Sequence, residues 1–309
     1  GRTADAAGEP LLVLGGGSNL VVADDGFDGT VLRVATDGAG PGPHGGLLVA
    51  AGVDWDGFVG SVVGQGLAGI EALSGIPGTV GAAPIQNIGA YGQDVSQTLT
   101  FVYALDRRTG ELVELTNAAC RFRYRHSVLK GDDRFVVLGV EFDGFSDSVP
   151  VRYAELARRL GVEVGEPAPP AEVREAVLAL RRGKGMVLDP DDHDTWSAGS
   201  FFTNPVLDAP DAARLLPEDA PRWPEGDGKV KTSAAWLIER AGFTKGYGRG
   251  AVSLSTKHTL ALTNRGGATT AELLGLAREI NPEGSARELD AGFPALTGDP
   301  SFRHGRRTT

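Results

Sequence analysis

The sequence has little cysteine and no long apolar run. Cys120 is the one cysteine among 309 residues, which excludes a disulfide framework, a CxxC pair and a zinc ribbon. No apolar run approaches the roughly 20 residues that a membrane helix needs, and no signal peptide opens the chain. A chain with one thiol is typical of a reducing compartment. These absences predict a cytoplasmic protein without a membrane partner.

Positive charge is also in short supply. The chain carries 30 Lys and Arg against 40 Asp and Glu, a net charge of −10, which argues against non-specific binding of nucleic acid. An anionic ligand would therefore need a locally basic or amide-rich pocket. The five histidines show no metal-ligand spacing, so we expect no metal site. No GxSxG elbow is present, and a hydrolase triad has no support.

Glycine and proline are abundant, at 45 and 18 residues, but 41% of the chain is hydrophobic, so the excess does not indicate disorder. Short β-branched runs separated by Gly and Asp predict strands in the first half. Apolar residues at helical spacing predict helices, mostly later. The expected strands cover 11–14, 20–22, 30–32, 47–50, 98–105, 112–115 and 135–142, and the expected helices cover 55–65, 171–182, 233–241 and 270–280.

The order of these elements predicts an α+β protein of two domains. The strand-rich first domain is expected over 1–150, and a helical connection with a mixed second domain over 151–309. A chain of this length can bury a sizeable core.

Two glycine clusters account for much of the glycine excess. The first covers residues 15–19 and follows a strand, and the second runs from 75 to 92. Glycines let the backbone approach a ligand and point successive N–H groups at a phosphate. Neither cluster has the GxGxxG pattern before a helix, and no GK[ST] is present. Tight hairpin turns are the alternative reading, so the residues alone predict an α+β protein that binds a phosphorylated ligand.

Several longer motifs occur in a fixed order. They are Gly15 to Leu20, LSGIPGTVGAAPIQNIGAYG at 73–92, YRxS at 124–127, GSFFxNP at 199–205 and AAWLIERAG at 234–242. Together they resemble the UDP-N-acetylenolpyruvoylglucosamine reductase family, over about residues 11–280.

The resemblance implies a vanillyl-alcohol-oxidase-like, PCMH-type FAD-binding domain followed by a C-terminal α+β substrate-binding domain. It implies an oxidoreductase of peptidoglycan precursor synthesis that uses FAD and NADPH. The substrate would be the enolpyruvyl ether of UDP-N-acetylglucosamine, reduced to UDP-N-acetylmuramate. The partner is then a small molecule, and the chain is expected to act as a monomer.

The resemblance also assigns residues. Ser200 falls on the family's proton donor and Arg125 on the Arg that faces the substrate carboxylate. Substrate contacts fall on Tyr91, Lys184 and Asn204, and His258 is a further candidate. The expected FAD-binding residues are Gly15, Gly16, Gly17, Ser18, Asn19, Gly75, Gly78, Thr79, Gly81, Asn87, Gly89 and Ala90.

The sequence departs from the family pattern at both ends. The strand–helix–strand unit that opens the family is expected to be missing here. The family's last catalytic residue is a Glu, and its position falls on Ala295, with Glu283 and Asp299 nearby. Two alternatives therefore stay open. One is an impaired or fragmentary homologue that only binds flavin or nucleotide, and the other is a related PCMH-type flavin oxidase.

Overall fold

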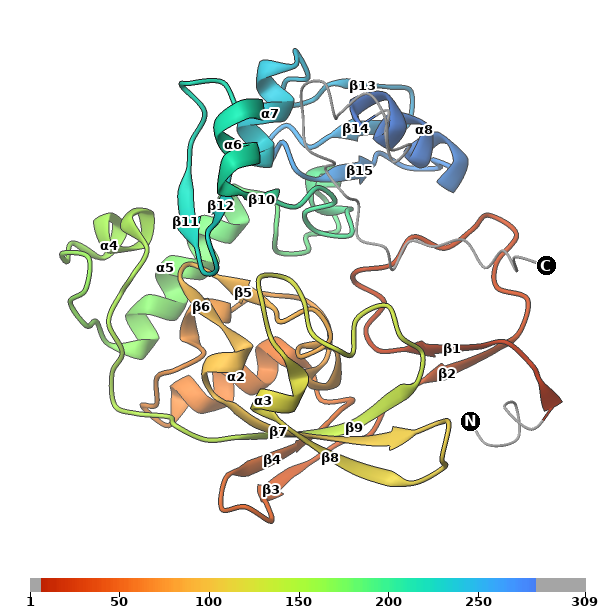
Figure 1. Cartoon of the computed structure of the whole chain (residues 1–309), viewed down its shortest axis with the longest axis vertical. Coiled ribbons are helices and arrows are strands. Elements are labelled where there is room, and N and C mark those ends of the chain that lie inside the picture. The colour runs from red at the N-terminus through yellow and green to blue at the C-terminus, as the bar shows by residue number, and fades with distance from the viewer. Residues whose placement is uncertain (1–6, 282–309) are drawn as a thin grey trace. The chain divides into compact units, whose positions relative to one another are not determined.

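A computed structural model describes residues 7–281 (Figure 1). The chain forms two compact units. Among the described residues, the first unit consists of 7–18 and 27–182, and the second of 19–26 and 183–281. The domain limits of 1–150 and 151–309 that the sequence suggests remain a prediction. No helix between residues 7 and 281 is long and apolar enough to cross a membrane.

A five-stranded antiparallel sheet is the centre of the first unit. Its strand order is β3-β4-β9-β7-β8. The strands are β3 (Ala39–Pro41), β4 (Leu47–Ala50), β7 (Leu99–Asp106), β8 (Leu112–Thr116) and β9 (Phe135–Phe142). β9 pairs with β4 on one side and β7 on the other, and seven of its eight residues are at least partly buried. This central strand therefore contributes heavily to the core.

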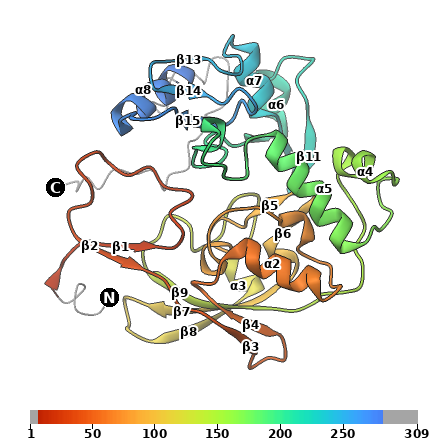
Figure 2. The same cartoon turned by 180° about the vertical axis from the view of Figure 1, so that it is seen from behind.

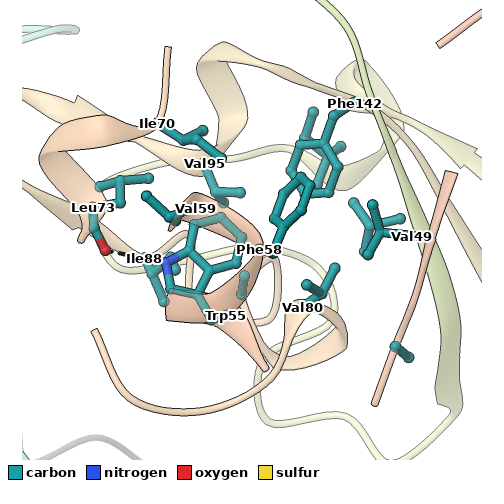
Figure 3. Packing of buried hydrophobic residues seen from close by; sticks show 14 of the residues in the cluster. Val49, Trp55, Phe58, Val59, Ile70, Leu73, Val80, Ile88, Val95 and Phe142 are labelled. Carbon is teal, nitrogen blue, oxygen red and sulfur yellow. Dashed lines mark hydrogen bonds between the residues drawn. The ribbon is translucent and has the colours of Figure 1, made fainter. Parts of the chain in front are cut away.

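Helix α2 (Trp55–Gly64) covers one face of this sheet (Figure 2). The Asp54 side chain accepts a hydrogen bond from Gly57 N at 2.8 Å and begins the helix as its N-cap. Trp55, Phe58 and Phe142 meet in the core between helix and sheet, as Figure 3 shows. The indole of Trp55 also donates to the Leu73 carbonyl at 3.1 Å. The aromatic cluster thus holds α2 and the segment that follows it on the sheet.

The remaining elements of the first unit are short. β1 (Leu11–Leu14) pairs in parallel with β2 (Thr30–Arg33), and β5 (Gly89–Ala90) forms a hairpin with β6 (Gln93–Asp94). The helical elements are η1 (Glu71–Leu73), η2 (Val80–Ala82), η3 (Val95–Gln97), α3 (Asn117–Cys120), α4 (Ala154–Leu160) and α5 (Pro170–Gly183). α4 and α5 share a core of their own, which includes Val173 and Val177.

The second unit contains two three-stranded antiparallel sheets with helices around one apolar cluster. One sheet has the order β10-β12-β11 and the other β13-β14-β15. The elements are η4 (His193–Thr195), β10 (Val206–Asp208), α6 (Ala209–Leu215), β11 (Trp223–Glu225), β12 (Lys229–Lys231), α7 (Ala234–Arg240), β13 (Gly248–Arg249), β14 (Val252–Leu254), β15 (Leu262–Asn264) and α8 (Thr270–Ile280).

The structure confirms the expected helices, and it corrects one strand. Residues 20–22 form no strand, although their apolar run predicts one. Val21 packs into the apolar cluster of the second unit, and the Val22 carbonyl accepts from Thr270 Oγ1. Asp24 accepts from the backbone N–H groups of Thr270 and Ala271, at 2.7 and 3.3 Å. These residues need no strand to bury part of their apolar surface, because they pack on the first turn of α8 instead of pairing in a sheet.

Candidate active site

The two glycine clusters meet in the first unit. A Cβ at Gly16 would lie 3.0 Å from Gly78 Cα, and a Cβ at Gly15 would lie 2.8 Å from Thr79 Oγ1. Ser18 Oγ donates to the Pro77 carbonyl at 3.2 Å. The backbones therefore pack at a distance that only glycine allows, and they bring segments about 60 residues apart into one site.

The second cluster is bonded to the start of α2 and to Ala51, the residue that follows β4. Trp55 N donates to the Gly78 carbonyl at 3.0 Å, and Gly81 N donates to the Ala51 carbonyl at 2.9 Å. A Cβ at Gly81 would lie 2.5 Å from the Ala51 Cβ, so this glycine too is required by close packing. The fold thus sets the position of residues 78–81 through backbone bonds.

Asp56 holds the beginning of the same cluster. Its carboxylate accepts from Gly75 N at 2.6 Å and from both terminal nitrogens of Arg174, on α5, at 2.6 and 2.9 Å. Burial raises the pKa of Asp56, but the bonds from Arg174 and Gly75 outweigh it, and the pKa lies below the ordinary value of 3.8. One carboxylate therefore links α2, the second glycine cluster and α5.

The second glycine cluster ends in a tight hairpin turn, the alternative that its glycine content also predicted. Tyr91 and Gly92, between β5 and β6, both have positive φ, at +48° and +87°, which is typical of a two-residue hairpin. Asn87 also has a positive φ, +45°. Non-glycine residues in this conformation are uncommon and gather at functional sites. The Tyr91 ring packs edge-on against Tyr153, with 5.4 Å between ring centres.

Arg125 lies in a turn beside this hairpin. Its Nη2 donates to the Gly89 carbonyl at 2.6 Å, and its φ is +52°. Backbone bonds between Arg123 and His126 close the turn, and Lys130 Nζ donates to the Arg125 carbonyl at 3.0 Å. Ser127, fully buried, donates to the Ile85 carbonyl at 2.7 Å. These bonds join the YRxS motif to the second glycine cluster.

Arg181, on α5, is a residue that sequence reasoning missed. Burial lowers the pKa of Arg181 and Arg125 lowers it further, whereas Tyr91 and Asp56 act in the opposite direction. A second arginine therefore lies in the neighbourhood of Arg125 and Tyr91. In the sequence, Arg181 belongs to a run of basic residues at the end of a helix, which is typical of charges exposed to solvent. Only the fold shows that this arginine is different from an ordinary surface residue.

In the second unit, Ser200 follows Gly199, which has a φ of +78°. The next two residues donate backbone N–H groups to the Leu260 carbonyl, Phe201 at 2.7 Å and Phe202 at 3.3 Å. Both phenylalanines are buried in the apolar cluster of this unit, whereas Ser200 is exposed. The segment is thus anchored by its aromatic residues and presents the serine at the surface of its own unit.

His258 contacts this serine. Its Nε2 lies 3.0 Å from Ser200 Oγ. The histidine belongs to the loop between β14 and β15, in which the buried Ser255 accepts from the backbone N–H groups of Lys257 and His258, at 3.0 and 3.2 Å. Sequence spacing could not reveal this pair, because 58 residues separate the two side chains.

Asn204 and Lys184 also belong to the second unit. Asn204 Oδ1 accepts from Ala234 N at 3.0 Å, at the start of α7. This bond gives the asparagine a structural role besides the predicted substrate contact. Lys184 is partly buried directly after α5. Ser200, His258 and Asn204 therefore lie in one unit, and Arg125, Tyr91 and most of the glycines in the other; Asn19 belongs to the second unit.

The remaining predicted positions lie beyond the part of the chain that is described. Ala295, Glu283 and Asp299, the positions considered for the family's Glu, fall within 282–309. Within residues 7–281, no group of three or more His, Cys, Asp or Glu could hold a metal ion.

Family models match both parts of the chain. Residues 2–116 match an FAD binding domain, and residues 189–283 match the C-terminal domain of UDP-N-acetylenolpyruvoylglucosamine reductase. The chain is thus an α+β flavoprotein with an FAD-binding domain followed by a second domain.

Whole-chain comparisons identify the family. The UDP-N-acetylenolpyruvoylglucosamine reductase of Thermobifida fusca is 58% identical over 294 residues, which cover 90% of this chain and 83% of that protein. The enzyme of the same name from Streptomyces avermitilis is 59% identical over 293 residues, 90% of this chain and 80% of the relative. The crystal structure of the Thermus caldophilus enzyme is similar with a TM-score of 0.62 at 25% identity, covering 91% of this chain and 84% of that one. This chain belongs to the UDP-N-acetylenolpyruvoylglucosamine reductase family.

Proposed function

We propose that this protein reduces the enolpyruvyl ether of UDP-N-acetylglucosamine to UDP-N-acetylmuramate, with NADPH as reductant and FAD as cofactor. The observation that carries the proposal is identity of 58% to a reductase of this name over 90% of the chain. The reaction belongs to peptidoglycan precursor synthesis, and through the cell wall it serves cell shape and division. The proposed location is the cytoplasm, and the proposed state is a monomer.

The first unit fits FAD at its two glycine clusters. Gly15, Gly16 and Gly78 lack the Cβ atoms that would separate the loops, and their backbone N–H groups can neutralise a diphosphate without lysine. Gly75, Thr79, Gly81 and the segment from Asn87 to Ala90 would complete the binding residues. When bound, FAD carries hydride from NADPH to the vinyl group of the substrate.

The roles of the protein's own groups follow from their chemistry. Reduction of the vinyl group leaves negative charge on the carbon next to the carboxylate. Arg125 would stabilise that charge through the carboxylate, because a guanidinium offers a fork of donors and stays protonated. Ser200 would then donate its hydroxyl proton to the carbon. Tyr91, Lys184 and Asn204 would contact the substrate, and Arg181 would add positive charge beside Arg125.

Anaerobic mixing experiments test this proposal. The purified protein should contain FAD, oxidise one equivalent of NADPH per flavin on its own, and turn over NADPH repeatedly only when the enolpyruvyl substrate is present. S200A should still allow NADPH to reduce the flavin, while formation of the saturated product falls by about a hundredfold or more. A protein that binds no flavin would contradict the proposal, and repeated NADPH oxidation in air without the sugar nucleotide would indicate an oxidase instead.

A further inference from the structure

The contact between Ser200 and His258 limits how the serine can act. A hydroxyl has one hydrogen to donate and two lone pairs that accept. If the hydrogen of Ser200 pointed at His258, it could not reach a substrate carbon. A serine that protonates substrate therefore needs its neighbour at 3.0 Å to be the donor of their shared hydrogen bond.

We propose that His258 is the positioning residue for Ser200 and donates from Nε2–H to Ser200 Oγ. The inference rests on the proposed function, in which Ser200 is the proton donor. It assigns the hydrogen of the imidazole to Nε2 and leaves the hydroxyl hydrogen of Ser200 to point at the substrate.

The proton balance of the step is simple. The O–H bond of Ser200 breaks as a C–H bond forms on the substrate carbon, and the electron pair of the O–H bond stays on Oγ. The Nε2–H group stabilises the negative charge that develops there, as donors do for oxyanions in other active sites. Water then returns a proton to Oγ, and the hydroxide left behind is neutralised by the one solvent proton that the overall reduction consumes.

The fold holds His258 firmly enough for this task. The buried Ser255 accepts from its backbone N–H, and Ala261 N donates to its carbonyl at 3.1 Å. The next residue, Thr259, is buried and donates to Glu239 on α7 at 2.6 Å. The carbonyl of Leu260 accepts from Phe201 and Phe202, so the same loop that carries the histidine also anchors the serine.

Single-turnover kinetics on the FAD-loaded enzyme test the proposal, with NADPH and the enolpyruvyl sugar nucleotide as the compounds used. In H258A, product formation by the reduced enzyme should fall at least about tenfold, while reduction of the flavin by NADPH stays within about twofold of wild type. H258Q places an amide N–H donor near the position of Nε2 and should recover most of the rate. H258E offers only acceptors at that length and should not recover it.

Two controls separate this role from a structural one. FAD content and the unfolding midpoint of each variant should match wild type. His193, whose ring packs on Trp196 at 4.2 Å, provides the matched variant H193A, which should leave both half-reactions unchanged. The proposal is overturned if H258A keeps its product-forming rate, if Glu restores it as well as Gln, or if both half-reactions slow in parallel. If wild type itself forms no product, the proposed function fails instead.

Discussion

At the residue scale, Gly16 is constrained by contact and not by backbone angle. Its φ is not in the left-handed region, yet a Cβ would lie 3.0 Å from the Gly78 backbone. A backbone neighbour cannot rotate away as a flexible side chain can. Separation of the two loops would disturb the N–H groups proposed to bind the FAD diphosphate.

We therefore expect G16A to weaken FAD binding by about tenfold or more, or about 1.4 kcal/mol. Titration of the apo-protein with FAD, followed by flavin fluorescence, measures the affinity. The matched variant is G64A in α2, where a Cβ meets nothing within 4 Å. G64A, at the last residue of α2, should leave the affinity unchanged. Equal affinities for G16A and wild type would remove the glycine clusters from the FAD site.

At the element scale, the Asp56 carboxylate connects α2, α5 and the second glycine cluster. Arg174, its partner on α5, lies two turns before Arg181 on the same helix. Loss of the carboxylate should therefore affect both the stability of the first unit and the position of Gly75. Since the side chain of Asp56 is 35% exposed, solvent screening limits the stabilisation that the ion pair provides.

We expect D56N to lower the free energy of unfolding by about 1–2 kcal/mol at pH 7. The pKa of Asp56 is lower in the folded state than the ordinary value of 3.8, so its contribution is complete only above about pH 5 and is lost as the pH falls through the folded-state pKa. The difference between D56N and wild type should shrink in acid.

Urea unfolding at several pH values checks this expectation. The control is D208N, which removes an ion pair to Lys229 whose side chains are 65% and 43% exposed, and its effect should stay below about 0.5 kcal/mol. A D56N effect that is independent of pH would mean that the charge of Asp56 contributes nothing.

At the scale of the whole molecule, ligand binding should stabilise the fold. A ligand that binds only the folded state adds about 2.7 kcal/mol when present at a hundred times its dissociation constant. The net charge of −10 repels an anionic ligand, so binding must come from local donors in the first unit.

We expect FAD to raise the unfolding midpoint of the apo-protein, and riboflavin at the same concentration to raise it less, because riboflavin lacks the diphosphate and the adenosine attached to it. Thermal unfolding followed by circular dichroism measures both shifts. Equal shifts would show that the glycine clusters do not recognise the diphosphate, and no shift with either compound would contradict a flavin site altogether.

The sequence determined the elements that depend on local pattern. The spacing of Val173 and Val177 identified α5, and the periodicity of residues 270–280 identified α8 with its bounds. The motifs were long enough to identify the family, because each combines several residue types in a fixed order. The run at 20–22 misled, since an apolar triplet has the same appearance in a strand and in an irregular segment packed on a helix.

The tertiary structure decided what depends on side chains far apart in the chain. It placed Gly16 against Gly78, Asp56 on Gly75 and Arg174, and His258 on Ser200. No periodicity records such pairs, because the contacts arise only when sheets, helices and loops fold together. The sequence therefore identified the family and its chemistry, whereas the fold determined which side chains position the reacting groups.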